Sequence, residues 1–184
     1  MHWSRYLGLT AISAALVGTS IDAPAAISGL TDGRVAFVAS GPAGMKIEGA
    51  TSDLQVADKV DDIVITVPLA NLTTGIGLRD KHMKEKYLEV QKYPLATLRV
   101  VRNSLKLPSA DDKIETDVPS TINIHGQVRP ATVHYEVKRD GTTLVARGRL
   151  HINITDFGIT VPSYLGVTVK PDIDVTANFR VAGG

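Results

Sequence analysis

Apolar and polar residues alternate with a period of two along most of the C-terminal half of this chain. The clearest run extends from Leu144 to Ile154, and another extends from Ile173 to Val181. A period of two places the apolar side chains of a strand on one face and the polar side chains on the other. Successive strands of this kind are typical of an antiparallel sheet with one face hidden from water. The chain is therefore predicted to be all-β.

The N-terminal half carries the same alternation in shorter runs, which one charged segment interrupts. Val35 and Phe37 share a face of one strand, and the alternating run Ile63–Val67 leads to a proline that ends or edges its strand. A charged, helix-prone segment, Leu78–Pro94, then precedes the strand that contains Leu98. An all-β chain with one such insert predicts a barrel whose mouth carries the insert.

The dipeptide Asp140-Gly141 is a strong signal for a two-residue hairpin turn, because both residues tolerate a positive φ. A turn at this point sets the register of the two flanking strands and places apolar residues opposite apolar or small ones. The predicted inner pairs are Val137 with Leu144, Tyr135 with Ala146, Val133 with Gly148 and Ala131 with Leu150, and a predicted outer pair is His134 with Arg147.

Several inward positions carry small residues, namely Gly49, Ala146, Gly148 and Ala177. A closed sheet of about eight strands has an interior just wide enough for side chains or for one small ligand, and small residues favour the ligand. Close packing, with aromatic side chains filling the gaps, is equally open at this point. A cavity would be lined by Phe37, Ile47, Ile63, Ile65, Val67, Leu98, Val100, Ile122, Ile124, Val133, Tyr135, Ala146, Gly148, Leu150, Ile152, Val175, Ala177 and Phe179.

Length and charge narrow the function classes. The 184 residues are enough for one domain with a substantial core. The formal net charge is +1, no basic block occurs, and aromatic residues make up only 5% of the chain. Nucleic-acid binding needs clustered Lys and Arg, so a nucleic-acid partner is not expected.

The first 25 residues read as a secretory signal peptide. Arg5 gives a positive start, Tyr6–Val17 is apolar, and Ala23-Pro24-Ala25 offers small residues for cleavage. The apolar run is shorter than the roughly 20 residues that span a bilayer. The chain has no cysteine, so an exported form needs no oxidative folding. We expect residues 27–184 to form a single domain without a transmembrane segment, in the periplasm or secreted after Sec-type signal peptide removal.

The predicted inner face carries one ionisable side chain, the phenol of Tyr135. Catalysis needs positioned acids, bases or nucleophiles, and the sequence contains neither a Gly-x-Ser-x-Gly elbow nor a glycine-rich phosphate loop followed by Lys. We therefore expect a protein that is not an enzyme and has no catalytic cofactor.

Histidine raises the question of a metal site, which usually takes three or four ligands. In the predicted hairpin, His134 and His151 both point outward and stand roughly 13 Å apart along the strands, too far to share one ion. His82 lies in the insert and His125 at a strand end. No metal site is expected.

The start of the insert allows two interpretations. Arg79, Asp80 and His82 could form a polar clamp at the barrel mouth. Alternatively, Asp80 caps a short helix that carries Met83 and Tyr87 at i, i+4 spacing, and Arg79 pairs with a neighbouring acid. The structural interpretation is favoured, because capping alone explains the pattern.

Three ordered segments carry a family resemblance. They are Arg79–Met83 continuing to Val90–Pro94, then Asn123–Pro130, and then Ile154–Ile159. Together they resemble the YceI-like family of bacterial, mostly exported proteins, and the similarity covers about residues 61–181.

The resemblance implies a roughly eight-stranded antiparallel, lipocalin-like β-barrel with a short helical insert near one mouth. It implies an amphipathic lipid as partner, with a quinone-like or polyprenyl isoprenoid or a fatty chain held in the lumen for transport, storage or sequestration. The expected rim residues are Arg79, Asp80, His82 and Phe157. Two rivals are an enzyme that acts on a lipid at the mouth and a stress or structural barrel with a filled core. A sheet edge or the insert could mediate a homodimer.

Overall fold

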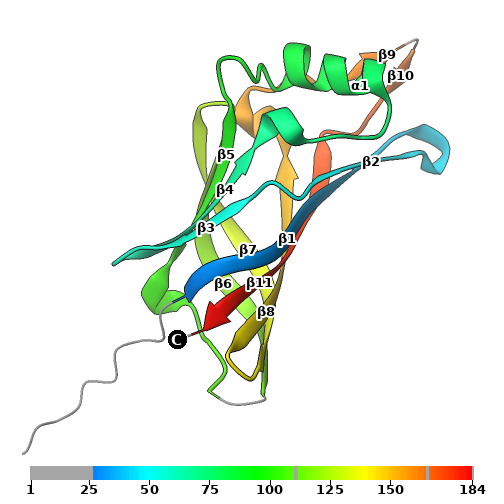
Figure 1. Ribbon diagram of the computed structural model, residues 1–184. Helices are drawn as coiled ribbons and strands as arrows, with labels where there is room; N and C mark the ends of the chain where they lie inside the picture. Colours follow the sequence, from blue (N-terminus) through cyan, green and yellow to red (C-terminus); the bar gives the residue numbers. More distant parts are fainter. Residues whose placement is uncertain (1–26, 110–111, 165, 184) are drawn as a thin grey trace, which may run out of the picture.

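The alternating segments of the sequence form one large antiparallel sheet in the computed structural model, which describes residues 27–109, 112–164 and 166–183 (Figure 1). The expected signal peptide, residues 1–25, lies outside this described part. The strands of the sheet are β1 (Ile27–Ser40), β2 (Lys46–Thr51), β3 (Gln55–Asp58), β4 (Asp62–Pro68), β5 (Leu95–Val101), β6 (Lys113–Ile124), β7 (Gln127–Asp140), β8 (Thr143–Asn153) and β11 (Asp172–Gly183).

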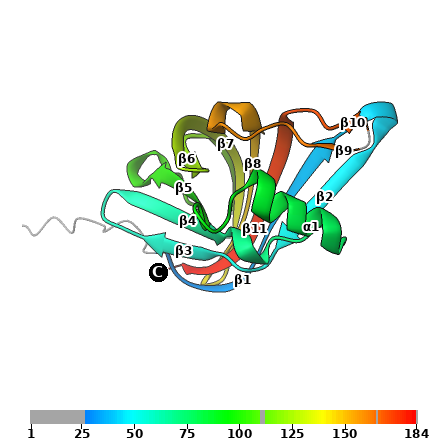
Figure 2. The ribbon, with the colours of Figure 1, turned by 90° about the horizontal axis from the view of Figure 1, so that it is seen from above.

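The sheet has nine strands in the order β2-β1-β11-β8-β7-β6-β5-β4-β3. It curls into a half-barrel, and the helical insert crosses one end (Figure 2). The all-β, curled antiparallel fold with an insert at one end is thus confirmed. The expected number of about eight strands is wrong, because the sheet has nine and a separate two-stranded ribbon pairs β9 (Ser163–Tyr164) with β10 (Val167–Thr168).

The two edge strands, β2 and β3, do not pair with each other in the sheet. β3 has only four residues, and other contacts close the seam. Thr73, beyond the end of β4, exchanges two backbone hydrogen bonds with Ala50 of β2, at 2.8 and 3.0 Å. At the other end, the backbone N–H of Ile27 donates to the Asp58 carboxylate across 2.7 Å. These backbone and side-chain contacts therefore close the seam between β2 and β3, which strand pairing would close in a complete barrel.

The β7–β8 hairpin has a register two residues away from the predicted one. Asp140 pairs with Thr143, so the two loop residues are Gly141 and Thr142. Gly141 has a φ of 58°, which suits a turn that takes glycine at its first central position. Tyr135 consequently faces Gly148. Because the shift is even, every side chain keeps its predicted face. The further observed pairs are Val137 with Ala146, Glu136 with Arg147 and His134 with Arg149.

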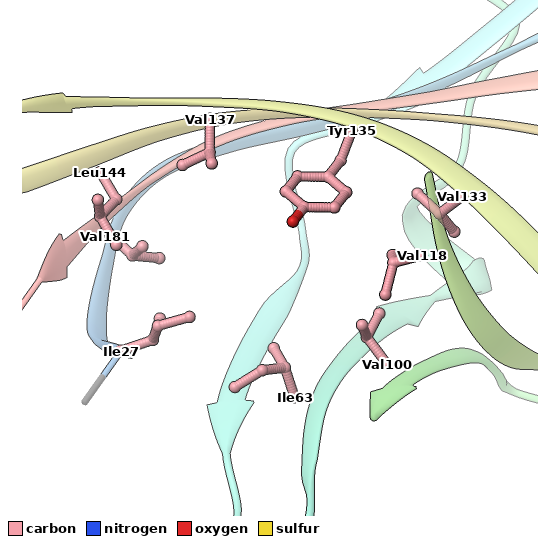
Figure 3. Packing of buried hydrophobic residues seen from close by; sticks show 9 residues of the cluster. All are labelled: Ile27, Ile63, Val100, Val118, Val133, Tyr135, Val137, Leu144 and Val181. Carbon is pink, nitrogen blue, oxygen red and sulfur yellow. The ribbon is translucent and has the colours of Figure 1, made fainter. Parts of the chain in front are cut away.

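One end of the half-barrel, which we call the packed end, is filled by buried aliphatic side chains. It lies where β7 ends and β8 begins, next to the start of β1 and the end of β11. Its most buried members, Val118, Val137, Leu144 and Val181, are 1–2% exposed. Figure 3 shows this cluster, whose side chains point toward a common interior: Ile27, Ile63, Val100, Val118, Val133, Tyr135, Val137, Leu144 and Val181.

The opposite end, which we call the mouth, carries the segments that are not part of the sheet. The insert contains α1 (Gly77–His82) and a π-helical turn, η3 (Met83–Tyr87). The β9–β10 ribbon lies at the same end (Figure 1). A 3-10 turn, Ile154–Phe157, follows β8 there. Within the described ranges, no helix is both long enough and apolar enough to cross a membrane.

Candidate functional site

A cavity of about 820 Å³ lies inside the curled sheet. Most of the side chains that line it are aliphatic or aromatic, and each of the 18 residues named above as its expected lining does line it. The interior is thus closely packed around its most buried side chains and still leaves a cavity, which those side chains also line. The lining residues expected from the sequence are Phe37, Ile47, Ile63, Ile65, Val67, Leu98, Val100, Ile122, Ile124, Val133, Tyr135, Ala146, Gly148, Leu150, Ile152, Val175, Ala177 and Phe179.

The hollow arises where small residues of adjacent strands stand side by side. Gly148 of β8 pairs with Ala177 of β11 on one side and with Tyr135 of β7 on the other. A Cβ built at Gly148 would meet only Val133 Cγ1, at 3.4 Å. Gly49 behaves differently, because a Cβ there would lie 2.3 Å from the ring of Phe37. One small residue therefore accommodates an aromatic ring, while the other leaves open space.

Tyr135 is a buried polar residue in the cavity wall, and its hydroxyl both donates and accepts a hydrogen bond. The hydroxyl accepts from the backbone N–H of Lys106 at 2.8 Å and donates to the Lys106 carbonyl at 3.0 Å. Burial raises the pKa of Tyr135 above its ordinary value, although the hydrogen bond to the Lys106 backbone opposes the rise. The phenol is thus a neutral structural group that ties β7 to the segment after β5.

At the mouth, two of the four expected rim residues line the cavity. Arg79 and His82 do so, together with Met83, Lys86 and Tyr87 of the same insert. The side chain of Arg79 donates from Nε to the Thr74 hydroxyl at 2.8 Å and from a terminal nitrogen to the Thr74 carbonyl at 2.9 Å. The predicted pairing of Arg79 with an acid is therefore replaced by hydrogen bonds to the preceding loop.

Asp80 does not line the cavity and does not cap α1, whose N-cap is Ile76. Its carboxylate accepts hydrogen bonds from the hydroxyls of Thr73 and Thr74 and from the Thr74 N–H. Burial opposes ionisation, but the hydrogen bonds from Thr73 and Thr74 outweigh it and lower the pKa of Asp80 below its ordinary value. Asp80 thus has the structural role that was favoured, but by a different contact: it locks α1 onto the loop that seals the β2 seam.

Phe157 is not at the rim. Its side chain is 2% exposed and packs in a second core cluster with Ile122, Ile124 and Ile159. Its carbonyl accepts a hydrogen bond from His125 Nδ1 at 3.1 Å. The expected head-group role of Phe157 gives way to packing, because the 3-10 turn after β8 directs the ring into the core.

The three sequence segments that carry the family resemblance meet at this point. The ring of Tyr93, from the end of the insert, lies with its centroid 4.3 Å from that of His125. A Cβ at Gly126 would lie 2.8 Å from Tyr93 Cε1, so the ring closely approaches the β6–β7 turn. His125 then connects to Phe157 in the third segment. Tyr93, His125 and Phe157, which come from the three different segments, therefore fasten the insert over the barrel.

Sequence reasoning missed several lining residues that lie outside regular strands. Leu69, Leu72 and Ile159 come from the connections, and Ile76 and Leu78 come from the start of the insert. Connections have no period of two, so alternation cannot assign their faces. Helical spacing could have found the insert residues, since Met83 and Tyr87 already stood out at i, i+4.

The outer face of the sheet carries charge pairs in place of apolar contacts. His134 lies between two carboxylates, 3.0 Å from Glu115 and 2.8 Å from Asp117. His151 lies 2.8 Å from Asp174 and 3.6 Å from Asp172. Each histidine thus has its own acids on a neighbouring strand. No group of three or more metal-ligating side chains with suitable geometry occurs among the residues that the structure describes.

Comparison with known proteins identifies the domain. The model of the YceI-like domain matches residues 30–181. No curated protein matches the sequence. Among solved structures, the fold is similar to a polyisoprenoid binding domain from Saccharophagus degradans implicated in plant cell wall breakdown, with a TM-score of 0.70 and 17% identity over 84% of this chain and 97% of that one. It is also similar to BcnA of Burkholderia cenocepacia, with a TM-score of 0.66 and 20% identity over 80% of this chain and 95% of that one.

Proposed function

This chain belongs to the YceI-like family, and we propose that it binds an amphipathic lipid, with an isoprenoid or fatty chain held in the apolar cavity. The observation that carries the proposal is the hollow of about 820 Å³ behind Gly148 and Ala177. This volume lies within the range of about 300–1,000 Å³ that is typical of ligand pockets. An apolar cavity gives water few hydrogen-bond partners, so an oily chain is its natural occupant.

The burial of a hydrocarbon chain supplies enough free energy without any polar anchor. Each buried methylene contributes about 0.8 kcal/mol, and micromolar affinity corresponds to about 8 kcal/mol net. A chain with some tens of carbons exceeds this requirement even after it loses much of its conformational freedom. Hydrophobic burial is non-directional, so the cavity should accept more than one kind of chain. The polyisoprenoid binding of the Saccharophagus domain supports an isoprenoid as the first candidate.

The mouth suits the polar end of such a lipid. The ionisable side chains that α1 and η3 contribute to the described lining are Arg79, His82, Lys86 and Tyr87. None of these is a carboxylate, so an electron-rich head group such as a phosphate, carboxylate or quinone oxygen would meet hydrogen-bond donors there.

Binding, rather than catalysis, is the proposed role. Tyr135 donates its proton to the Lys106 carbonyl and accepts a hydrogen bond from the Lys106 N–H, and Asp80 is directed away from the cavity into the Thr73–Thr74 loop. Neither is placed to take a proton from a bound lipid. The proposed setting is the periplasm or the cell exterior, after removal of the leader at residues 1–25, and the proposed task is transport, storage or sequestration.

Native mass spectrometry of the purified protein tests the proposal. A lipid-loaded protein should carry an extra mass that organic extraction removes and that chromatography with mass detection identifies. Gly148→Leu and Ala146→Phe should lose most of this mass, because both side chains would enter the hollow. Asn178→Leu is the matched control, because Asn178 is exposed and lies next to the inward Ala177 in β11.

Circular dichroism of each variant verifies that the sheet is intact. Full lipid content in both filled variants would reject the cavity as the site. A wild-type protein that purifies without extra mass and does not bind added polyprenyl phosphate or fatty acid would reject the function.

A further inference from the structure

Three apolar residues that line the cavity are exposed to water. Ile76 is 53% exposed, Leu78 is 57% exposed and Val167 is 42% exposed, yet all three line the cavity. Lys86 and Ser163 are the other exposed lining residues of the same segments. These residues come from the insert and from the β9–β10 ribbon, so the opening of the cavity lies between those two elements.

Exposed apolar side chains concentrate at this end of the molecule. Leu95 and Val128 are also exposed, and they begin β5 and β7 at the mouth. At the opposite end, exposed aliphatic residues are limited to Val60, in the β3–β4 turn, and Val101, at the end of β5, among those the structure describes. An apolar rim that continues into an apolar cavity is a feature of interaction sites rather than of ordinary surface.

The charges around the opening are mostly positive. Between Gly77 and Tyr87 the insert has four cationic side chains, Arg79, Lys81, Lys84 and Lys86, against two carboxylates, Asp80 and Glu85. Asp80 is engaged by Thr73 and Thr74. On the other side of the opening, the sequence from Phe157 to Val169 contains no charged residue. The mouth therefore combines an uncharged flank with a basic one, while the whole chain has a net charge of only +1.

From these observations we propose that the mouth is a docking surface for a bilayer of anionic phospholipid. Ile76, Leu78 and the β9–β10 ribbon enter the interfacial layer, while Lys81 and Lys84 contact lipid phosphates. The inference rests on the proposed function, because a docked mouth lets a lipid chain pass between bilayer and cavity without exposing its methylenes to water. Apolar rim, basic flank and cavity opening coincide at one end, which is the arrangement that such exchange requires.

Vesicle flotation tests the docking surface with the purified protein. Vesicles of phosphatidylcholine mixed with phosphatidylglycerol should carry the protein upward in a density gradient, and vesicles of phosphatidylcholine alone should carry less. Added salt should weaken the first interaction, because it screens exposed charges. Lys81→Gln with Lys84→Gln should lower partitioning by about five-fold for each lysine. Ile76→Ser with Leu78→Ser should lower it by about ten-fold or more on both kinds of vesicle.

Val60→Ser with Val101→Ser is the matched control, because it removes two exposed aliphatic side chains from the opposite end. Partitioning of this variant should equal that of wild type. An equal loss in the control and the mouth variants would overturn the proposal. So would a wild-type protein that stays with the soluble fraction on anionic vesicles.

Failure of docking and failure of lipid binding give different results. Lys81 and Lys84 do not line the cavity, so their double variant should keep the lipid mass seen by native mass spectrometry. If the wild-type protein retains its lipid but does not bind anionic vesicles, the docking proposal alone is refuted. A protein that floats with vesicles but never carries a lipid refutes the proposed function.

Discussion

The packed end and the mouth end of the half-barrel are built from the same strands, yet the inward side chains are large and buried at the first and smaller or partly buried toward the second. At the packed end, Leu144 of β8 lies opposite Val181 of β11, and both are at most 2% exposed. Four residues further along the same pair of strands, Gly148 lies opposite Ala177, and the cavity wall there consists of small, partly buried residues. The alternation is identical at both places. The difference teaches that residue size at inward positions, and not polarity, separates core from binding site.

The first way to test this comparison is to make one substitution at both ends. Leu144→Ala should destabilise the protein by about 2–5 kcal/mol, because it opens a void in a close-packed cluster. Leu150→Ala, on the same strand and face, should cost less by about 1 kcal/mol or more, because Leu150 is only partly buried, whereas Leu144 is 1% exposed. Urea unfolding followed by circular dichroism measures both values. Equal losses would show that the two ends are packed alike.

Tyr135→Phe probes the boundary between the two ends. The variant keeps the ring but removes the two hydrogen bonds to the Lys106 backbone, at an expected cost of about 1–1.5 kcal/mol. Tyr87→Phe, at the mouth, is the matched control and should change the free energy of unfolding by less than about 0.5 kcal/mol. If the two variants unfold at the same urea concentration, the Tyr135 hydroxyl does not tie β7 to the neighbouring segment.

The outer face gives the smallest expected effect, and it should leave the comparison of the two ends unchanged. The hydrogen bonds to Glu115 and then to Asp117 raise the pKa of His134, and that to Asp174 does the same for His151. Both pKa values lie above that of an unfolded chain, so the protonated histidines stabilise the fold. This stabilisation is complete below about pH 6.5 and is lost as the pH rises through the raised pKa values.

Unfolding measured from about pH 5 to about pH 8 should therefore show a modest fall in stability, which His134→Gln with His151→Gln should flatten. Salt should reduce the effect, because both side chains are solvent-accessible. Carboxylates titrate below this window and do not contribute. The difference between Leu144→Ala and Leu150→Ala should be the same at both ends of the range. Stability that rises with pH would contradict the assignment of the two ion pairs.

Much of the fold could be predicted because period-two alternation is a local property. It assigned the inner face of the alternating part of each long strand, including the face of both strands of the β7–β8 hairpin. The register of that hairpin could not be obtained from Asp140-Gly141, since the same glycine fits either of two turns and only pairing with neighbouring strands selects one. The ninth strand escaped prediction because β3 is only four residues long.

The candidate site was predictable in its walls but not in its mouth. Inward side chains such as Val175 and Phe179 follow from alternation. The contacts of Asp80 with Thr73 and of His125 with Phe157 depend on how the insert and the turn after β8 lie over the barrel. No local pattern indicates such contacts. Phe157, which was expected at the rim, is for this reason found in the core.

The sequence by itself determined which side chains turn inward and that few of them are ionisable, because both follow from the order of residues along each strand. Only the tertiary structure decided that the inward faces enclose a cavity and that they are packed more tightly at one end of it than at the other. That outcome depends on sheet curvature, on strand register and on the contacts that hold the insert across the opening, all of which join residues far apart in the chain.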